Sequence, residues 1–200
     1  MKNILITRRE SEFEKCLYDV FVREGYNIFV DNPENDIKIV EPIDLYIDVS
    51  DERDAADVFT IRDGIDEDLI GRVYKRNVLD SMRLLEKYLP LSDKGEGKCL
   101  CFLSGAEASI NETRDKSGYA YKLSKAAMHN FYQMVLNRLS PDGYSIRIYD
   151  PMCGEVDAKA AAEGAFNYFT RRRGSENDDT SRDDETRSVL RDALGREHSW

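Results

Sequence analysis

The stretch of residues 121–139 reads YKLSKAAMHNFYQMVLNRL, and its apolar positions predict a helix that begins near residue 119. Tyr121 and Lys125 are four residues apart, so both side chains lie on one face of that helix. A nearby ammonium group stabilises a phenolate and lowers the pKa of the tyrosine. A tyrosine tuned in this way can donate a proton to a carbonyl or accept one from an alcohol. The stretch therefore predicts a helix that carries an acid–base pair.

Apolar runs on both sides of this helix alternate between the length of a strand and the spacing of a helix. The expected strands cover residues 3–7, 26–30, 37–40, 45–49, 98–103 and 144–149, and the expected helices cover residues 10–24, 66–90, 119–139 and 159–169. The final run, SVLRDALGREHSW, predicts a last strand and a turn. Strands that alternate with helices form a mostly parallel sheet with helices on both faces. We expect a single α/β domain over residues 1–200, with a Rossmann-like three-layer fold and a doubly wound sheet.

The composition is that of a soluble globular protein, with 41% hydrophobic and 34% charged residues. A net charge of −10 argues against a nucleic-acid partner, which needs a basic surface. No apolar run reaches the roughly 18 residues of a membrane span, and the N-terminus MKNILIT lacks the pattern of a signal peptide. We therefore expect a cytoplasmic protein that binds neither nucleic acid nor membrane. The charged segment 171–187 predicts a mobile loop.

The cysteine and histidine residues predict no metal site. All four cysteines lie in or beside apolar segments, which is typical of reduced core cysteines in the cytoplasm. Cys99 and Cys101 alternate within one strand, and two thiols alone do not make a zinc site. His129 and His198 are far apart in the sequence and lack ligand spacing, so both are interpreted as structural.

Three segments together resemble one enzyme family. CLCFLSGAEASI at residues 99–110 is similar to a strand and turn that bear a catalytic serine, and YKRNVL at residues 74–79 places Asn77 in a helix. SGYAYKLSKAAMHNF at residues 117–131 contains the pattern Tyr-x-x-Ser-Lys followed by two alanines. In this order the segments resemble the short-chain dehydrogenase/reductase family over most of the chain. The ending LGREHSW is similar to the carbonyl-reductase-like, or cell–cell-signalling-factor-like, branch of that family.

The resemblance implies roles for three residues of the site. Tyr121 would transfer a proton to or from the substrate oxygen, and Lys125 would lower its pKa and contact the ribose of NAD or NADP. Asn77 would support the proton relay. The substrate would be a small carbonyl compound or alcohol, because the nicotinamide supplies or takes the hydride while the protein orients the reactants.

Two serines are candidates for the residue that holds the substrate oxygen. Ser104 ends its strand, but the next position, where the family usually has its catalytic serine, is Gly105. Ser109 lies 12 residues before Tyr121, which is close to the usual separation in the family. Ser109 is therefore favoured slightly over Ser104.

The loop after the first strand departs from the family pattern Thr-Gly-x-x-x-Gly-x-Gly. It reads TRRESEFE at residues 7–14, so Arg8, Glu12 and Glu14 stand where the family has glycines. Those glycines let a pyrophosphate approach the helix N-terminus, and the glutamates would repel it. Thr7 and Arg8 stay candidate cofactor contacts, with a solvated helix start as the favoured interpretation of the charged residues.

The adenosine-binding half also departs from the family. Asp31 ends the second strand, where an NAD-type enzyme places its ribose-binding carboxylate, although such an Asp is more often a simple turn residue. The chain between the second strand and the strand at 45–49 is short, so the helices that flank the adenosine are expected to be largely absent.

Two functions from different classes follow from these features. The first is an NAD(P)-linked oxidoreductase with a weakened or remodelled cofactor site, which the set of Tyr121, Lys125 and Asn77 favours. The second is a pseudoenzyme that binds no dinucleotide and acts as a binding or assembly protein, which the altered glycine loop favours. Helices matching residues 66–90 and 119–139 form a dimer interface in the family, so we expect a homodimer, with core packing as the competing interpretation.

Overall fold

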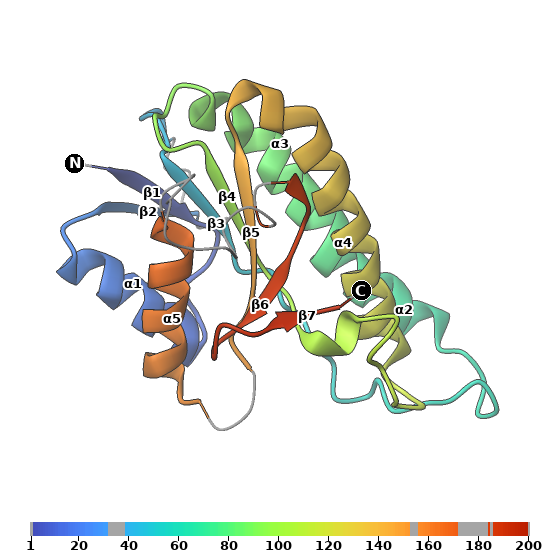
Figure 1. The fold of residues 1–200 in the computed structure, drawn as a ribbon. Helices are drawn as coiled ribbons and strands as arrows, with labels where there is room; N and C mark the ends of the chain where they lie inside the picture. Colours follow the sequence, from blue (N-terminus) through green and yellow to red (C-terminus); the bar gives the residue numbers. More distant parts are fainter. Residues whose placement is uncertain (1, 32–38, 153–155, 172–183, 185, 200) are drawn as a thin grey trace.

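The computed structural model describes residues 2–31, 39–152, 156–171, 184 and 186–199, which form three layers (Figure 1). Within those residues, seven strands make one sheet in the order β2-β1-β3-β4-β5-β6-β7. The strands are β1 (Asn3–Ile6), β2 (Asn27–Val30), β3 (Leu45–Asp48), β4 (Cys99–Leu103), β5 (Ser145–Asp150), β6 (Leu190–Asp192) and β7 (Glu197–His198). Neighbours from β2 to β6 pair in parallel, and β7 pairs antiparallel with β6.

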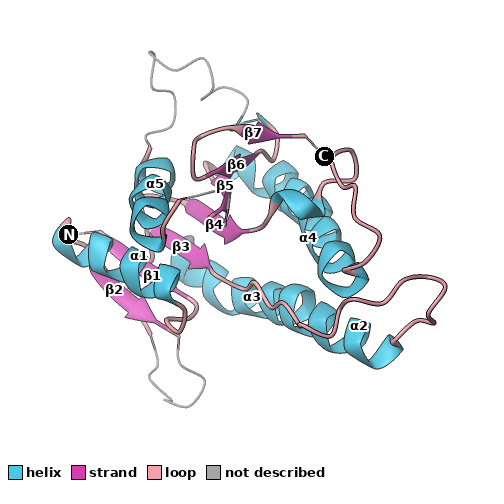
Figure 2. Ribbon diagram, turned by 90° about the horizontal axis from the view of Figure 1, so that it is seen from below, coloured by secondary structure: helices cyan, strands magenta, loops and turns pink. Residues whose placement is uncertain are grey.

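Helices cover both faces of the sheet (Figures 1 and 2). One face carries α1 (Glu12–Arg23) and α5 (Ala158–Thr170), which pack side by side. The other face carries α2 (Glu67–Tyr74), the π-helical segment η1 (Lys75–Asp80), α3 (Ser81–Ser92) and α4 (Tyr119–Leu139). Two 3₁₀ turns, η2 (Ala106–Ala108) and η3 (Ser140–Asp142), complete the described elements. The predicted Rossmann-like α/β fold with a mostly parallel sheet is confirmed.

Polar side chains fix the start of three helices. Ser11 Oγ accepts a hydrogen bond from the backbone of α1 at 3.2 Å, Asp66 from that of α2 at 2.9 Å, and Asp157 from that of α5 at 2.7 Å. Each such cap stabilises a helix by about 1 kcal/mol, because it satisfies an N–H group that has no partner within the helix.

Apolar side chains fill the space between the sheet and each helical layer. Successive residues of β4 point to opposite faces, so Cys101 packs toward α1 and α5 while Phe102 packs toward α4. Phe102 stacks on Tyr132 of α4 with 4.2 Å between the ring centroids. Burial of one such ring contributes roughly 2–3 kcal/mol, so these layers hold α4 firmly against the sheet edge where the site lies.

The expected helix over residues 66–90 differs from the structure in its middle. α2 and α3 are joined by η1, so the hydrogen-bond pattern widens around Asn77. Such π segments often occur at functional positions of a helix. No periodicity in the sequence signals this change, because the apolar spacing continues through it.

Three expected segments fall wholly or partly outside the described residues. Residues 39–40 of the expected strand 37–40 belong to no strand, and residues 37–38 lie outside the described part. The connection from β2 to β3 is short, and its described residues contain no helix. Most of the predicted mobile loop 171–187 also lies outside the described residues. None of the helices in the described part is both long and apolar enough to cross a membrane.

Candidate active-site cleft

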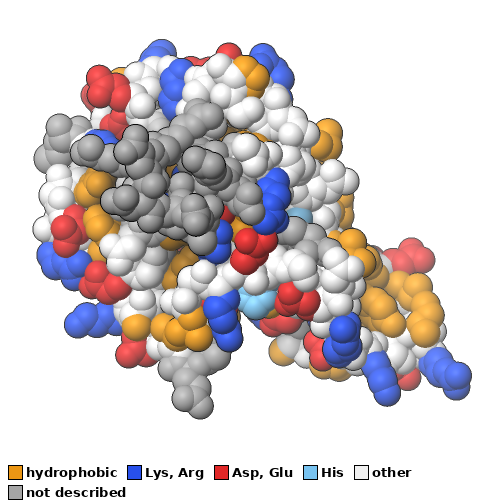
Figure 3. Space-filling view, in the orientation of Figure 1, with side chains coloured by type: hydrophobic (Ala, Val, Ile, Leu, Met, Phe, Trp, Pro, Cys, Tyr) orange, Lys and Arg blue, Asp and Glu red, His pale blue; other side chains and the backbone are white. Residues whose placement is uncertain are grey.

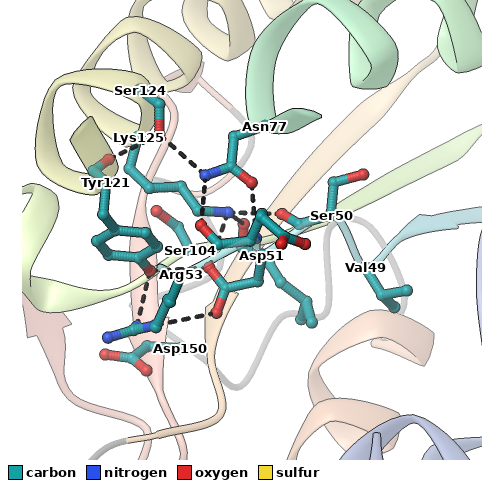
Figure 4. Close-up of polar contacts among 12 residues, drawn as sticks. Val49, Ser50, Asp51, Arg53, Asn77, Ser104, Tyr121, Ser124, Lys125 and Asp150 are labelled. Carbon is teal, nitrogen blue, oxygen red and sulfur yellow. Dashed lines mark hydrogen bonds and ion pairs between the residues drawn. The ribbon is translucent and has the colours of Figure 1, made fainter. Parts of the chain in front are cut away.

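The carboxyl ends of β1, β3, β4 and β5 meet at one edge of the sheet, which is where open α/β folds bind ligands. Segments far apart in the sequence meet at this edge (Figure 4). α4 supplies Tyr121 and Lys125, η1 supplies Asn77, and the loop after β3 supplies Asp51 and Arg53. Three residues predicted from the sequence therefore lie together, beside two charged residues that were not predicted.

Tyr121 is buried, and two charged side chains hold its hydroxyl group. The hydroxyl donates to Asp51 Oδ1 at 2.8 Å and accepts from Arg53 Nη2 at 2.7 Å. The Arg53 guanidinium also covers the Tyr121 ring, 4.1 Å from its centroid. Burial and the negative charge of Asp51 raise the pKa of Tyr121 well above that of a free tyrosine. The net shift is upward in this structure because burial and Asp51 outweigh the lowering effect of the Arg53 guanidinium.

Lys125 is 1% exposed, and acceptors from the protein surround its ammonium group. Its Nζ donates to the carbonyl of Ser50 at 2.6 Å and to that of Leu103 at 3.1 Å, and it lies 2.9 Å from Asp51 Oδ1. An ammonium group has three N–H donors, so these contacts use its full capacity. Burial alone would raise the pKa of Asp51, but the charges of Lys125 and Arg53 outweigh it and lower that pKa.

Asn77 connects η1 to the loop that carries the two unpredicted charges. Its Oδ1 accepts from the backbone N–H of Glu52 at 2.7 Å, and its Nδ2 donates to the carbonyl of Glu52 at 2.9 Å. The same Nδ2 donates to Ser124 Oγ on α4 at 3.0 Å. Asn77 therefore fixes the backbone between Asp51 and Arg53, and through it the position of both side chains.

Ser104 and Gly105 follow the carboxyl end of β4, and the two positions face different neighbours. Ser104 Oγ lies 2.7 Å from His129 Nε2, and burial lowers the pKa of His129 so far that its ring is neutral. At Gly105 an added Cβ would lie 3.0 Å from the hydroxyl oxygen of Tyr121. The position that faces the phenol is therefore 105, which has no side chain.

Ser109 lies with the C-terminal segment. Its hydroxyl donates to the carbonyl of Ser199 and accepts from the backbone N–H of Glu112, the latter at 3.0 Å. Glu112 pairs with His198 Nδ1 at 3.0 Å, and His198 Nε2 lies 3.1 Å from Asp192. The structure thus places Ser109 beside β7, and the hydrogen bonds described for it do not include the Tyr121 hydroxyl.

The carboxylate of Glu14 lies at the N-terminus of α1 and binds backbone N–H groups there. The carboxylate accepts from the backbone N–H groups of Glu10 and Ser11, the latter at 2.9 Å, and Arg8 Nη2 lies 3.2 Å from it. Glu14 is 2% exposed. Its negative charge therefore stands at the end of the helix where a bound anion is normally stabilised.

The remaining predicted cofactor contacts also bind residues of the chain. Thr7 Oγ1 donates to Asp48 Oδ1 at 3.2 Å. Asp31 accepts from Lys87 Nζ at 2.9 Å and from the hydroxyl of Tyr88, both on α3. Thr7 and Asp31 thus have their polar atoms engaged by the protein, and their role as cofactor contacts stays a prediction.

Known structures share this arrangement of the sheet and helices. The carbonyl reductase Sniffer of Caenorhabditis elegans superposes with a TM-score of 0.75 at 14% identity, and 99% of each chain is covered. A short-chain dehydrogenase/reductase of Burkholderia multivorans with bound NADP gives 0.74 at 15% identity, over 100% of this chain and 99% of that one. A carbonyl reductase of Pseudomonas aeruginosa gives 0.71 at 16%, over all of both chains.

The chain has the short-chain dehydrogenase/reductase fold. A curated dehydrogenase of Rhodococcus sp. (strain AD45), which acts on 1-hydroxy-2-glutathionyl-2-methyl-3-butene, is 28% identical over 106 residues. That match covers 53% of this chain and 46% of the dehydrogenase, so it spans less than half the length of that protein. No protein-family model matches the chain. Because a fold hosts many functions, the activity has to be argued from the site.

Within the short-chain dehydrogenase/reductase fold, sequence reasoning missed Asp51, Arg53 and the buried role of Glu14. A signal for the first two was present, since DERD at residues 51–54 directly follows an apolar strand and so lies at the ligand-binding edge of the sheet. Glu14 gave a weaker signal, the Ser-x-x-Glu spacing from Ser11 that is typical of a capping box. Within the described ranges, the His, Cys, Asp and Glu residues form no group that could hold a metal ion.

Proposed function

We propose that this chain is a non-catalytic protein on the short-chain dehydrogenase/reductase scaffold, which acts as a binding or assembly protein. One observation carries the proposal: Asp51 and Arg53 engage the Tyr121 hydroxyl, and Asp51 also pairs with Lys125. Acid–base catalysis requires the tyrosine to reach a substrate oxygen within hydrogen-bond distance. In this cleft the Tyr121 hydroxyl instead donates to Asp51 and accepts from Arg53, which are side chains of the chain itself.

Opening this network is costly. Lys125 could contact a ribose only by giving up one of its three acceptors, and Asp51 is the one that a substrate would have to displace. Loss of one partner from a buried ion pair destabilises a protein by about 3–5 kcal/mol. Binding energy from a cofactor would have to offset that amount before it could favour any chemical step.

The described residues do not fit a dinucleotide in the way of the family. A pyrophosphate would bind at the N-terminus of α1, but the Glu14 carboxylate accepts there from the backbone N–H groups of Glu10 and Ser11, just before the helix, and would repel a phosphate. A ribose would need the Asp31 carboxylate, which Lys87 and Tyr88 engage.

An NAD(P)-linked reductase of a small carbonyl compound, or an alcohol dehydrogenase, is the second candidate. Its specific support is that Tyr121, Lys125 and Asn77 lie at one sheet edge in the family's order. The Arg53 side chain is 38% exposed, so it has room to swing away from the phenol. This function requires both Asp51 and Arg53 to leave the Tyr121 hydroxyl when a cofactor binds.

Two apolar surfaces support a role in assembly. A groove of about 650 Å³ between α3 and α4 is lined by Met82, Phe131 and Met134, and Met134 is 63% exposed. We assign it to a second copy of the chain, which makes the protein a homodimer through these helices. Figure 3 shows further hydrophobic side chains over the projecting segment before α2, where Val58 and Ile61 are 71% and 68% exposed. An exposed patch of this kind marks an interaction surface.

Calorimetric titration with NADH and with NADPH tests the proposal. We expect no heat of binding at millimolar cofactor for the wild type. Binding tighter than about 100 μM, roughly −5.5 kcal/mol, would contradict the proposal, and turnover of a carbonyl compound that is lost in Tyr121→Phe would establish the second candidate. Light scattering after gel filtration measures the dimer separately, with Met134→Glu expected to yield monomer.

A further inference from the structure

Residues 54–66, here called the arm, project from the helical layer just before α2 (Figures 1 and 2). Two contacts tie the inner side of the arm to the start of α4. The Asp57 carboxylate accepts from the backbone N–H of Tyr121 at 2.9 Å. The Phe59 ring lies 5.6 Å from the ring of Tyr119, measured between centroids. The arm is therefore a fixed projection, whose side chains are in place before any partner binds.

The outer side of the arm is apolar and is followed by acidic residues. Val58, Ile61 and Ile65 are 71%, 68% and 56% exposed. Glu67 and Asp68 come next, in the first turn of α2, and their exposed carboxylates have no partner among the described residues. Their charge suits the start of a helix, and it leaves their oxygen atoms open to a partner. An exposed apolar patch with charges at its rim is typical of an interaction surface.

The groove of about 650 Å³ between α3 and α4 is apolar inside and carries arginines at its rim. The side chains of Arg83 and Arg138 are 66% and 76% exposed. Each pairs with an aspartate three or four residues away, at 3.3 and 3.1 Å. Exposed pairs of this kind hold a side chain only weakly, so both arginines can turn to a carboxylate that a partner brings. The groove also contains Glu86, and the exposed Arg62 on the arm has the opposite charge.

The arm and the groove lie at opposite ends of one helical layer (Figure 1). The arm packs on Tyr119, the first residue of α4, whereas the groove is lined by residues 131–139 at the end of that helix. Along α2, η1 and α3, Leu85 in the groove is roughly 27 Å from residue 67, at about 1.5 Å per residue. The arm therefore cannot fill the groove of its own chain, and both surfaces are left for another molecule.

We propose that the arm of each copy of the chain fills the groove between α3 and α4 of a second copy. Val58, Ile61 and Ile65 enter the groove, and the carboxylates of Glu67 and Asp68 meet the arginines at its rim. Two copies whose helical layers pack face to face and antiparallel make both contacts at once, as a closed twofold dimer requires. Apolar side chains at the centre and charged pairs at the rim are the usual anatomy of such an interface. The arrangement rests on the homodimer of the proposed function and names the segment that occupies its groove.

Sedimentation equilibrium over a range of protein concentrations measures the dissociation constant of the dimer and tests the arm directly. Val58→Glu places a charge on the apolar side of the arm, and we expect the dissociation constant to rise at least about tenfold. Val22→Glu is the matched control, because Val22 is 51% exposed on α1, which covers the opposite face of the sheet. This control should dimerise like the wild type. Circular dichroism checks that both variants are folded.

An exchange of charges identifies the groove as the partner of the arm. Glu67→Lys combined with Asp68→Lys should weaken the dimer, because positive charges then face each other across the interface. Arg83→Glu combined with Arg138→Glu should weaken it for the converse reason. In a protein that carries all four substitutions, opposite charges face each other again. We expect its dissociation constant to return to within about threefold of the wild-type value, as coupled positions do in a mutant cycle.

The outcomes separate the arm contact from the homodimer itself. A wild-type dimer that Met134→Glu dissociates and Val58→Glu does not would overturn the arm contact and leave the proposed homodimer intact. A monomeric wild type would overturn both. Equal weakening in Val58→Glu and Val22→Glu would overturn the arm contact, and so would a fourfold variant that dimerises no more tightly than the two double variants.

Discussion

In the function that we propose, the loop after β1 and the site at Tyr121 are both blocked to a ligand, but by different routes. In the loop the proposal rests on the residues themselves, Arg8, Glu12 and Glu14, at positions where the resemblance to the family leads us to expect glycines. In the cleft Tyr121 and Lys125 are present, yet side chains from another loop take their polar atoms. A site can thus be blocked either because its residues are replaced or because other side chains bind to the residues that it keeps.

The ion pairs in the two regions also differ in how deeply they are buried. The Asp51–Lys125 pair is almost completely buried, whereas Arg8, which pairs with Glu14, is 34% exposed in its side chain. Solvent screens the second pair more strongly than the first. Substitutions in the cleft should therefore cost more stability than substitutions in the loop.

The largest effect is expected for Lys125→Met, which keeps the bulk of the side chain and removes its charge. Asp51 is then left buried with one cation fewer, and we expect a loss of about 3–5 kcal/mol in the free energy of unfolding. Denaturant unfolding followed by circular dichroism measures it. Lys122→Met is the control on the same helix, because Lys122 pairs with the exposed Asp115 and should cost under about 1 kcal/mol. Equal losses of unfolding free energy in the two variants would contradict the expected difference between buried and exposed ion pairs.

An intermediate effect is expected for Glu14→Gln. The variant weakens the contacts to Arg8 and to the start of α1, and we expect a loss of about 1–2 kcal/mol. The same unfolding measurement applies, with Glu12→Gln as the control, because Glu12 is exposed in the same turn. If neither variant changed the free energy of unfolding, the contacts of the Glu14 carboxylate would contribute nothing to stability. The proposal that this carboxylate blocks the loop would then fail.

The smallest effect concerns His198, which lies outside both regions and holds the end of β7. Burial alone would lower its pKa, but hydrogen bonds to Glu112 and Asp192 outweigh burial and raise it. A raised pKa in the folded state means that this stabilisation is complete below about pH 6.5 and is lost as the pH rises through the folded-state pKa. We expect at most about 1 kcal/mol, measured as a fall in melting temperature, relative to that of His198→Gln, from about pH 6 to about pH 8.5.

His198→Gln is the reference protein, because His129 contributes to the pH dependence with the opposite sign. Burial lowers the folded-state pKa of His129, so only the unfolded state takes up its proton and stability falls as the pH drops below about 6.5. Both proteins share that contribution, so the difference between their melting temperatures isolates His198. A difference that does not shrink as the pH rises would assign the pH dependence to a group other than the pair that holds β7.

The sequence predicts the layers of this fold better than the partners within its site. Apolar periodicity follows burial directly, so the strands, the helices and the shared face of Tyr121 and Lys125 could be predicted. Partners in an ion pair depend instead on the path of a loop, here residues 49–66, which has no periodicity. The placement of Ser109 beside Ser199 could not be predicted either, since it depends on where the C-terminal strand returns.

Gly105 decides which side chains would have to move if a serine stood beside Tyr121. A Cβ at this position would lie 2.5 Å from Glu107 Oε2, so a serine could enter only if Glu107 withdrew from Arg53. Conversely, removal of Arg53 alone would open the space but leave no hydroxyl in it. The group that a serine at position 105 would have to displace is thus the flexible end of an exposed side chain, not backbone. Gly105→Ser is therefore a single substitution that would place a hydroxyl beside the phenol of Tyr121.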